Sequence, residues 1–208
     1  MIIQGHEVEF IEDGHIYLCD GVIVPSVTQI LKMRFGDKYS RVNEATLTAA
    51  AEKGTAVHKA IEDYCKDGTE SDLEELRNFK FLKKKYDFEV IDNEVPILLL
   101  NNKNHKPICA GRFDLQISKN GMMGLADIKR TSTLDKEYLG FQLNIYRLAF
   151  NQCYGGSIDF LAGIHLREKT RKFVEIPINE DLTYKLLDEW GGYYDRRRTE
   201  SDIEGLFR

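Results

Sequence analysis

Two aspartates and a lysine interrupt a segment that otherwise has the pattern of a β-hairpin. Residues 111–131 read GRFDLQISKNGMMGLADIKRT, so that Asp114 lies in the first apolar run, and Asp127 and Lys129 lie in the second. An Asn-Gly dipeptide between two such runs is typical of a two-residue type I′ turn. The segment therefore predicts two paired strands that carry charged groups where apolar side chains are expected.

The turn also predicts which residues of the two strands face each other. If the Asn-Gly dipeptide supplies both turn residues, each residue of the first strand has one opposed partner in the second. Opposed residues share a face of the sheet, with Cβ atoms about 4.5–5.5 Å apart. Counting back from the turn pairs Lys119 with Met122, Asp114 with Asp127, and Arg112 with Lys129.

This register would place two carboxylates and one ammonium group on the same face. Like charges directly opposite each other destabilise a sheet, so Asp114 and Asp127 require a compensating cation. Oxygen ligands suit Mg²⁺ or Mn²⁺, and a bound ion can activate water for phosphodiester hydrolysis while Lys129 stabilises developing charge. The alternative is a surface ion pair between Lys129 and either aspartate, and the register alone leaves the two interpretations balanced.

Helical patterns flank the hairpin and supply further polar side chains. A helix is predicted over residues 42–66, where His58 lies at the edge of an apolar stripe. A second helix is predicted after a capping box formed by Ser71 and Glu74, and a third over residues 137–152. Because His58 lies at the edge of that apolar stripe, its imidazole can point from the helix towards the sheet.

The remaining segments complete the pattern of one α/β domain with helices packed on a mixed sheet. Before the long helix, we expect short strands with turns at 13–14 and 20–21, a helix from Ser26 to Leu31, and a loop over 34–41. After the second helix, we expect a strand over 88–100, a second hairpin over 157–178, and a helix over 181–195 that is interrupted or ended at Gly191 and Gly192.

The composition is that of an ordinary globular chain of 208 residues, 42% hydrophobic and 30% charged, with a net charge of −5. This charge counts against extensive coating of nucleic acid, although it leaves room for a local basic rim. There is no run of about 18 apolar residues and no signal-peptide pattern, which predicts no membrane span. The four cysteines form no CxxC pair, so reduced thiols of a cytoplasmic protein are expected.

Four segments in chain order resemble the motifs of the PD-(D/E)xK nuclease superfamily, and within it the RecB-like and phage-type exonuclease branch. GTAVHKAIE with His58 resembles the upstream helix motif, and GRFD with Asp114 resembles the first acidic motif. ADIKRT, with Asp127 and Lys129, matches the D/ExK core, and QLNIY matches the QxxxY helix motif. The resemblance covers about residues 15–150.

The resemblance implies a restriction-endonuclease-like core, in which a central mixed β-sheet is flanked by helices. It also implies a single nuclease domain over residues 1–208, with a strand and helix elaboration over 1–40 and the nuclease core over 41–208.

The resemblance also implies roles for individual residues. The implied catalytic residues are Asp114, Asp127, Lys129, Gln142 and Tyr146. The implied ligands of Mg²⁺ or Mn²⁺ are His58, Asp114, Asp127 and the backbone carbonyl of Ile128, with Glu94 as a further candidate. The implied contacts to substrate are Arg112, Arg130, Thr131, Gln142 and Tyr146. Because only Cys153 follows the QLNIY motif, we expect no iron–sulfur cluster of the kind that some relatives carry.

The implied function is that of a metal-dependent DNA nuclease. We expect an exonuclease of phage or prophage origin that acts in recombination, replication or repair in the cytoplasm of a bacterial host. DNA is the expected partner, a recombination or single-strand-annealing protein and a homo-oligomer are further expectations, and no membrane is involved. A structure-specific endonuclease and a non-cleaving nucleic-acid-binding module with a nuclease fold are the alternatives.

Overall fold

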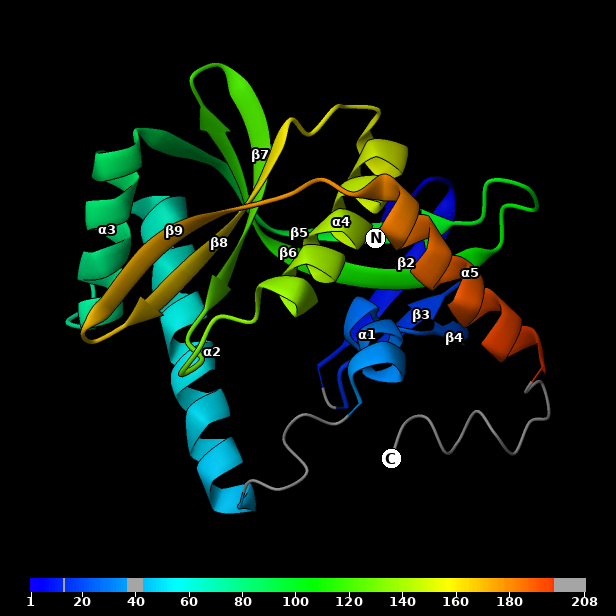
Figure 1. Ribbon diagram of the computed structural model, residues 1–208, viewed down its shortest axis with the longest axis horizontal. Helices are drawn as coiled ribbons and strands as arrows, with labels where there is room; N and C mark the ends of the chain where they lie inside the picture. Colours follow the sequence, from blue (N-terminus) through cyan, green and yellow to red (C-terminus); the bar gives the residue numbers. More distant parts are fainter. Residues whose placement is uncertain (13, 37–42, 197–208) are drawn as a thin grey trace.

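The computed structural model describes residues 1–12, 14–36 and 43–196, which form two sheets and five helices (Figure 1). The strands are β1 (Ile2–Ile3), β2 (His6–Ile11), β3 (Ile16–Cys19), β4 (Val22–Val24), β5 (Phe88–Leu100), β6 (Pro107–Lys119), β7 (Met122–Lys129), β8 (Phe160–Arg167) and β9 (Thr170–Ile176). The helices are α1 (Val27–Phe35), α2 (Glu44–Asp67), α3 (Glu74–Tyr86), α4 (Lys136–Tyr154) and α5 (Glu180–Arg196).

The central sheet is mixed and has the strand order β5-β6-β7-β8-β9. Neighbouring strands are antiparallel except for β7 and β8, which run parallel. Parallel neighbours need a crossover connection instead of a tight turn, and α4 supplies it. The sheet with its flanking helices confirms the predicted fold class and is compatible with a restriction-endonuclease-like core.

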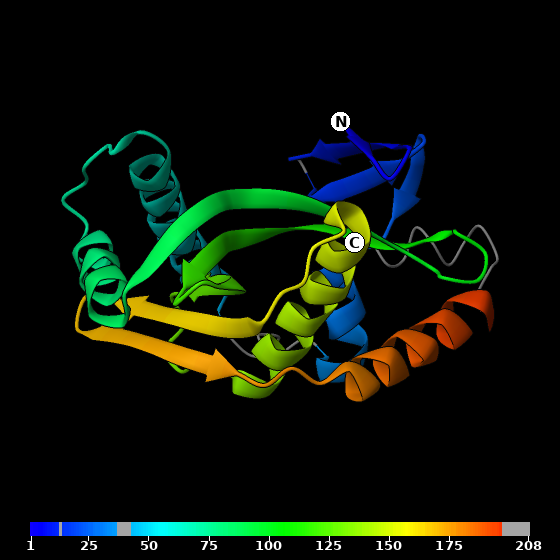
Figure 2. The same cartoon turned by 90° about the horizontal axis from the view of Figure 1, so that it is seen from above.

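Helices cover both faces of this sheet. On one face, α2 and α3 pack through apolar side chains that include Ile61 and Phe79. On the other face, α1, α4 and α5 pack through side chains that include Ile30, Leu143 and Trp190. Figure 2 shows β5 and β6 running from α3 at one end of the molecule to the loop beside α5 at the other end. The two longest strands therefore connect both groups of helices.

The N-terminal strands form a small second sheet that packs on β5 and β6. Leu98, Leu100 and Ala110 of the long strands join the apolar cluster of this sheet. Ile97 and Leu99 alternate with them and face the cluster of α1 and α4, as the period of a strand requires. The N-terminal sheet thus shares apolar side chains with the central sheet, and the division of the chain near residue 40 stays a prediction.

Two helix boundaries differ from the prediction. Ser26 caps α1 as expected, because its hydroxyl accepts a hydrogen bond from the N–H of Gln29, but the helix continues to Phe35. Helix α5 runs through Gly191 and the glycine after it to Arg196, so the predicted interruption is wrong. The predicted turn at 13–14 and loop at 34–41 fall partly outside the described residues.

The predicted capping box before α3 is also wrong. The helix begins at Glu74 after Leu73, which offers no capping side chain. The hydroxyl of Ser71, two residues before the N-cap position, instead accepts a hydrogen bond from the N–H of Leu73.

Two expectations concern the chain as a whole. All four cysteines lie in the described ranges, where they are free thiols. Of the helices placed by the structure, none combines the length and the apolar character that a membrane crossing needs.

Candidate metal centre and active site

The hairpin of β6 and β7 has the predicted register, but it ends just short of the two aspartates. Every pair from the turn at 120–121 to Leu115 and Ala126 follows the prediction. The ladder stops at this pair, so Asp114 and Asp127 are not paired residues. The two strands separate here, and the side chain of Asp114 replaces the next backbone contact.

Asp114 bridges the two strands with its carboxylate. Its Oδ2 accepts a hydrogen bond of 2.6 Å from the backbone N–H of Ile128. The expectation that Arg112 pairs with Lys129 is wrong for the same reason, because the ladder of β6 and β7 ends before it reaches them. Asp114 thus links β6 to β7 just beyond the last pair of their ladder.

Three possible metal ligands from different elements converge at Asp114. His58 from α2, Glu94 from β5 and Asp114 from β6 each offer a ligand atom, and these atoms lie within 4.8 Å of one another. The trio includes Glu94, which the sequence offered only as a further candidate. Two carboxylates and an imidazole form a donor set that suits Mg²⁺ or Mn²⁺.

The ring of His58 is oriented so that one nitrogen faces the trio. Its Nε2 lies 3.0 Å from the carbonyl oxygen of Ile128, and only a protonated nitrogen can donate to that carbonyl. Nδ1, on the other side of the ring, faces Asp114, with Oδ1 at 3.6 Å. Metal-binding histidines typically donate their other N–H to a backbone carbonyl in this way. In this arrangement the carbonyl of Ile128, a predicted ligand, orients His58.

Glu94 is held in a backbone conformation that is unusual for a strand. Its φ is 52°, in the left-handed region, although it lies within β5. The pairs on either side of it, Asn93 with Leu115 and Val95 with Phe113, place Glu94 opposite Asp114. A strained non-glycine residue inside a strand is most often found at a functional site.

Both carboxylates of the trio have a raised pKa, chiefly because they are buried. Burial raises the pKa of Asp114, and the charge of nearby Asp127 adds to this effect. Burial likewise raises the pKa of Glu94, and the charge of Asp114 adds to it. Arg112 counters part of this, since its guanidinium lies 2.6 Å from the carboxylate of Glu94. A cation bound between the two carboxylates would therefore stabilise their charged forms.

Asp127 and Lys129 form an ion pair beside the trio. Nζ of Lys129 lies 2.6 Å from Oδ2 of Asp127, whose side chain is 2% exposed against 24% for the lysine. Burial works against the charge of Lys129, but Asp127 and Asp114 together raise its pKa, so the lysine is positively charged at neutral pH. Lys129 is the partner of Oδ2 of Asp127 in the described structure, and a carboxylate oxygen has lone pairs to accept a further contact.

Gln142 and Tyr146 lie on one buried face of α4, as their spacing predicted. Burial raises the pKa of Tyr146 well above its usual value, so the phenol is neutral. The ring packs on Gly111, where an added Cβ would lie 3.0 Å from Cε1 of Tyr146. Oε1 of Gln142 is buried and has no hydrogen-bond partner in the part of the chain that the structure describes.

Two of the residues that were predicted to contact substrate make contacts within the protein. The guanidinium of Arg130 lies 2.7 Å from the buried carboxylate of Glu75 and 2.9 Å from that of Glu168. The hydroxyl of Thr131 donates to the carbonyl of Thr133 at 2.8 Å. The structure thus gives Arg130 a bridging role between β7 and α3. This role could not be predicted from the sequence, because the residues around Glu75 do not indicate that its carboxylate is buried.

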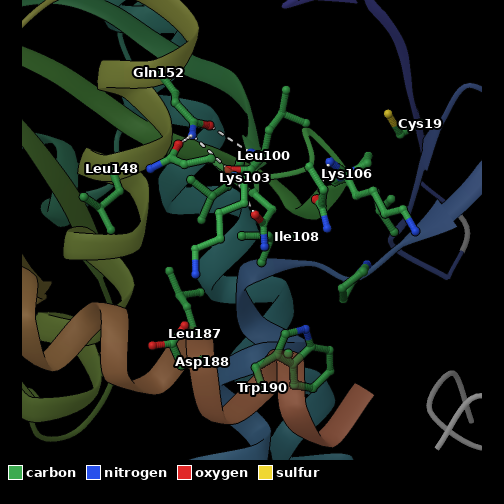
Figure 3. A pocket seen from close by; sticks show the side chains of 18 of the residues that line it. Cys19, Leu100, Lys103, Lys106, Ile108, Leu148, Gln152, Leu187, Asp188 and Trp190 are labelled. Carbon is green, nitrogen blue, oxygen red and sulfur yellow. Dashed lines mark hydrogen bonds between the residues drawn. The ribbon is translucent and has the colours of Figure 1, made fainter. Parts of the chain in front are cut away.

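A separate hollow lies at the other end of the molecule. It has a volume of about 970 Å³ and lies between α4, α5 and the loop after β5. Figure 3 shows Lys103, Lys106, Gln152, Asp188 and Trp190 around it. None of the candidate ligands or catalytic residues contributes to its walls, so the hollow is distinct from the candidate site.

Comparisons with known proteins leave the family open. No family model matches the chain, and no curated protein matches it. A solved structure named SSO0001 has a TM-score of 0.46 and 19% identity, and covers 80% of this chain and 74% of that chain. A protein from Eubacterium rectale, provisionally assigned as an exonuclease, has a TM-score of 0.49 and 13% identity, with 83% and 79% covered. Likeness at this level carries no argument about function, which must come from the site.

Proposed function

We propose that this protein is a metal-dependent nuclease that hydrolyses phosphodiester bonds in DNA. One observation carries the proposal: His58, Glu94 and Asp114 converge from three separate elements directly beside the ion pair of Asp127 and Lys129. Each of these elements is held in place by its own packing, so the convergence does not depend on one flexible loop.

The residues present fit a hard divalent cation. Nδ1 of His58 and the carboxylates of Glu94 and Asp114 would hold it, and the ion would offset the cost of burying the two negative charges, which raises the pKa of both carboxyls. Asp127 remains a proposed further ligand, because its Oδ2 has acceptor capacity left among the described contacts. Mg²⁺ or Mn²⁺ bound here would neutralise a phosphate and lower the pKa of a bound water.

Lys129 is the proposed catalytic cation. Its ammonium group is fixed by Asp127 and remains partly exposed, so it can reach a phosphate oxygen. A positive group held in advance near the reacting phosphorus stabilises the charge that develops there. Asp127 therefore has a role through Lys129 as well as its proposed role as a ligand.

Gln142 and Tyr146 form the proposed wall of the site on α4. The neutral phenol and the amide are buried, and Oε1 of Gln142 has no partner in the described structure. These two groups can orient Lys129, a water molecule or a phosphate by hydrogen bonds. Thr131 stays a proposed substrate contact, and it begins the loop that joins Lys129 to this helix.

The finer assignment rests on the sequence motifs. The order of GTAVHKAIE, GRFD, ADIKRT and QLNIY supports the RecB-like and phage-type branch of the PD-(D/E)xK nucleases, and hence an exonuclease. A structure-specific endonuclease would use the same groups, so the choice between them depends on the substrate and not on the chemistry.

The test is cleavage of end-labelled linear DNA and closed circular DNA in Mg²⁺, Mn²⁺ or EDTA. We expect the linear DNA to be degraded in either metal ion and to stay intact in EDTA, with Asp114→Asn as the inactive control. Cutting of circles would replace the exonuclease with an endonuclease. If no nucleic acid is cleaved in any metal ion, the proposed activity is wrong and a binding module remains.

A further inference from the structure

The strand next to the catalytic strand carries a buried histidine that the proposed chemistry does not use. His165 of β8 is 4% exposed and lies in parallel register with Lys129 of β7. Two positions away along the same strands, Gly163 is in register with Asp127. Side chains repeat on one face with a period of two, so His165 shares the face of Asp127 and Lys129.

The imidazole of His165 is bonded to the loop that follows Lys129. Its Nε2 lies 2.7 Å from the carbonyl oxygen of Thr131, and only a protonated nitrogen can donate to this carbonyl. Nδ1 is buried and has no hydrogen-bond partner among the described residues. Burial of a polar atom without a partner costs free energy, and an apolar side chain at this position would avoid that cost. The hydrogen bond to Thr131 is the contact that offsets it.

That contact is placed where the two halves of the candidate site are joined. Residues 130–135 connect β7, which carries Lys129, to α4, which carries Gln142 and Tyr146. Asp135 at the end of the loop caps α4, since its carboxylate accepts a hydrogen bond from the N–H of Tyr138. The loop is thus fixed at its far end by the cap and at its near end by His165.

We infer that His165 is a positioning residue for the proposed nuclease reaction. It fixes the carbonyl of Thr131 and thereby sets the direction of the chain from Lys129 into α4. The inference rests on the proposed function for its effect on cleavage, but the anchoring of the loop is a property of the protein itself. Displacement of a catalytic group by about 1 Å can cost on the order of 100-fold in rate, so a lost anchor would be visible.

The experiment compares two substitutions at this position with a control elsewhere. His165→Leu removes the donor, whereas His165→Gln can place an amide N–H near the position of Nε2. Gln152→Leu is the matched control, because Gln152 also bonds to the backbone, at N–H and C=O of Leu100 beside the distant hollow (Figure 3). All three variants are measured for kcat, KM, Mn²⁺ dependence and amide hydrogen exchange.

We expect His165→Leu to lower kcat on the order of 10- to 100-fold while KM and the Mn²⁺ midpoint change by less than about twofold. His165→Gln should recover most of the lost kcat, and Gln152→Leu should keep the wild-type value. Amide hydrogens of residues 132–134 should exchange faster in His165→Leu and at the wild-type rate in His165→Gln.

Several results would overturn the inference. These are a wild-type kcat in His165→Leu, an equal loss in the Leu and Gln variants, or an equal loss in Gln152→Leu. Unchanged exchange of the loop in His165→Leu would overturn it as well, and this readout does not need activity. If the wild-type protein cleaves no nucleic acid, the proposed function fails, and the exchange measurement alone decides whether His165 anchors the loop.

Discussion

The ammonium group of Lys129 lies against Asp127 and outside the trio of candidate ligands. Its removal should therefore affect the chemistry more than the binding of the ion. We expect Lys129→Ala to lower kcat by a factor on the order of 100 or more, as loss of a group that stabilises transition-state charge does. The stabilisation of the protein by Mn²⁺ in thermal melts should remain.

Lys119→Ala is the control for this prediction, since Lys119 of the same hairpin pairs with Glu175 and lies in register with Met122 beside the turn. That variant should keep its kcat. A Lys129→Ala protein that retains most of the wild-type kcat would remove the catalytic role.

A second prediction at the residue scale concerns the charge of Asp114 in the metal-free protein. Burial, with Asp127 nearby, raises its pKa in the folded state. The charged carboxylate then lowers stability progressively as the pH rises above the unfolded value of about 3.9, until the pH passes the folded-state pKa. Asp114→Asn removes this charge and keeps an acceptor for the N–H of Ile128. In EDTA at neutral pH it should melt at a higher temperature than wild type.

The difference should shrink as the pH falls towards 3.9, and in Mn²⁺ the order should reverse because a ligand is lost. Asp92→Asn changes an exposed aspartate of β5 and should leave the melting temperature nearly unchanged. If Asp114→Asn is the less stable protein in EDTA, Asp114 is chiefly a partner of His58 and of the backbone.

At the scale of elements, the site depends on the separation of strands. Strands β6 and β7 separate beyond Leu115 and Ala126, and in β5 the left-handed φ of Glu94 interrupts the extended backbone opposite Asp114. Where the ladder of β6 and β7 has ended, the carboxylate of Asp114 accepts the N–H of Ile128. Helix α2 brings His58 to the carbonyl of the same residue.

Glu94→Gln tests whether β5 contributes to the ion. Because Gln keeps the size of the side chain and removes its charge, the fold should persist. We expect the Mn²⁺ concentration that gives half of the maximal thermal stabilisation to rise on the order of 10-fold. Glu89→Gln on the same strand is the control, since Glu89 is largely exposed beside Lys83. Equal Mn²⁺ dependence in both variants would exclude Glu94 as a ligand.

At the scale of the whole molecule, the two sheets share apolar side chains. Leu98 is fully buried between the N-terminal sheet and β5, and it belongs to the same cluster as Val8 and Tyr17. A shared core predicts that both sheets unfold together. We expect coincident melting curves by far-ultraviolet circular dichroism and by the fluorescence of Trp190 in α5.

Leu98→Ala should lower the free energy of unfolding by about 2–5 kcal/mol and keep a single transition, because the cavity lies in a core that both sheets use. Val22→Ala is the control, since Val22 of β4 is 67% exposed and its loss should cost little. Two separate transitions in either protein would show that residues 1–40 fold as an independent unit.

Those parts of the site that lie close together along the chain could be predicted from local patterns. The register of the hairpin followed from its Asn-Gly turn, and the contact of Asp127 with Lys129 followed from the period of one strand. The shared face of Gln142 and Tyr146 followed from the period of one helix. Local periodicity and turn chemistry act within a few residues, and the order of residues records them directly.

Contacts between groups that lie far apart along the chain depend on how the elements pack. The carboxylate that lies opposite Asp114 is Glu94 and not Asp127, because the β6–β7 ladder ends early and β5 pairs on the other side. The nitrogen of His58 that faces the trio, and the engagement of Arg130 by Glu75, depend on how α2 and α3 pack on the sheet. Such contacts arise when helices and strands are brought together by burial of apolar side chains, and no spacing along the chain encodes them.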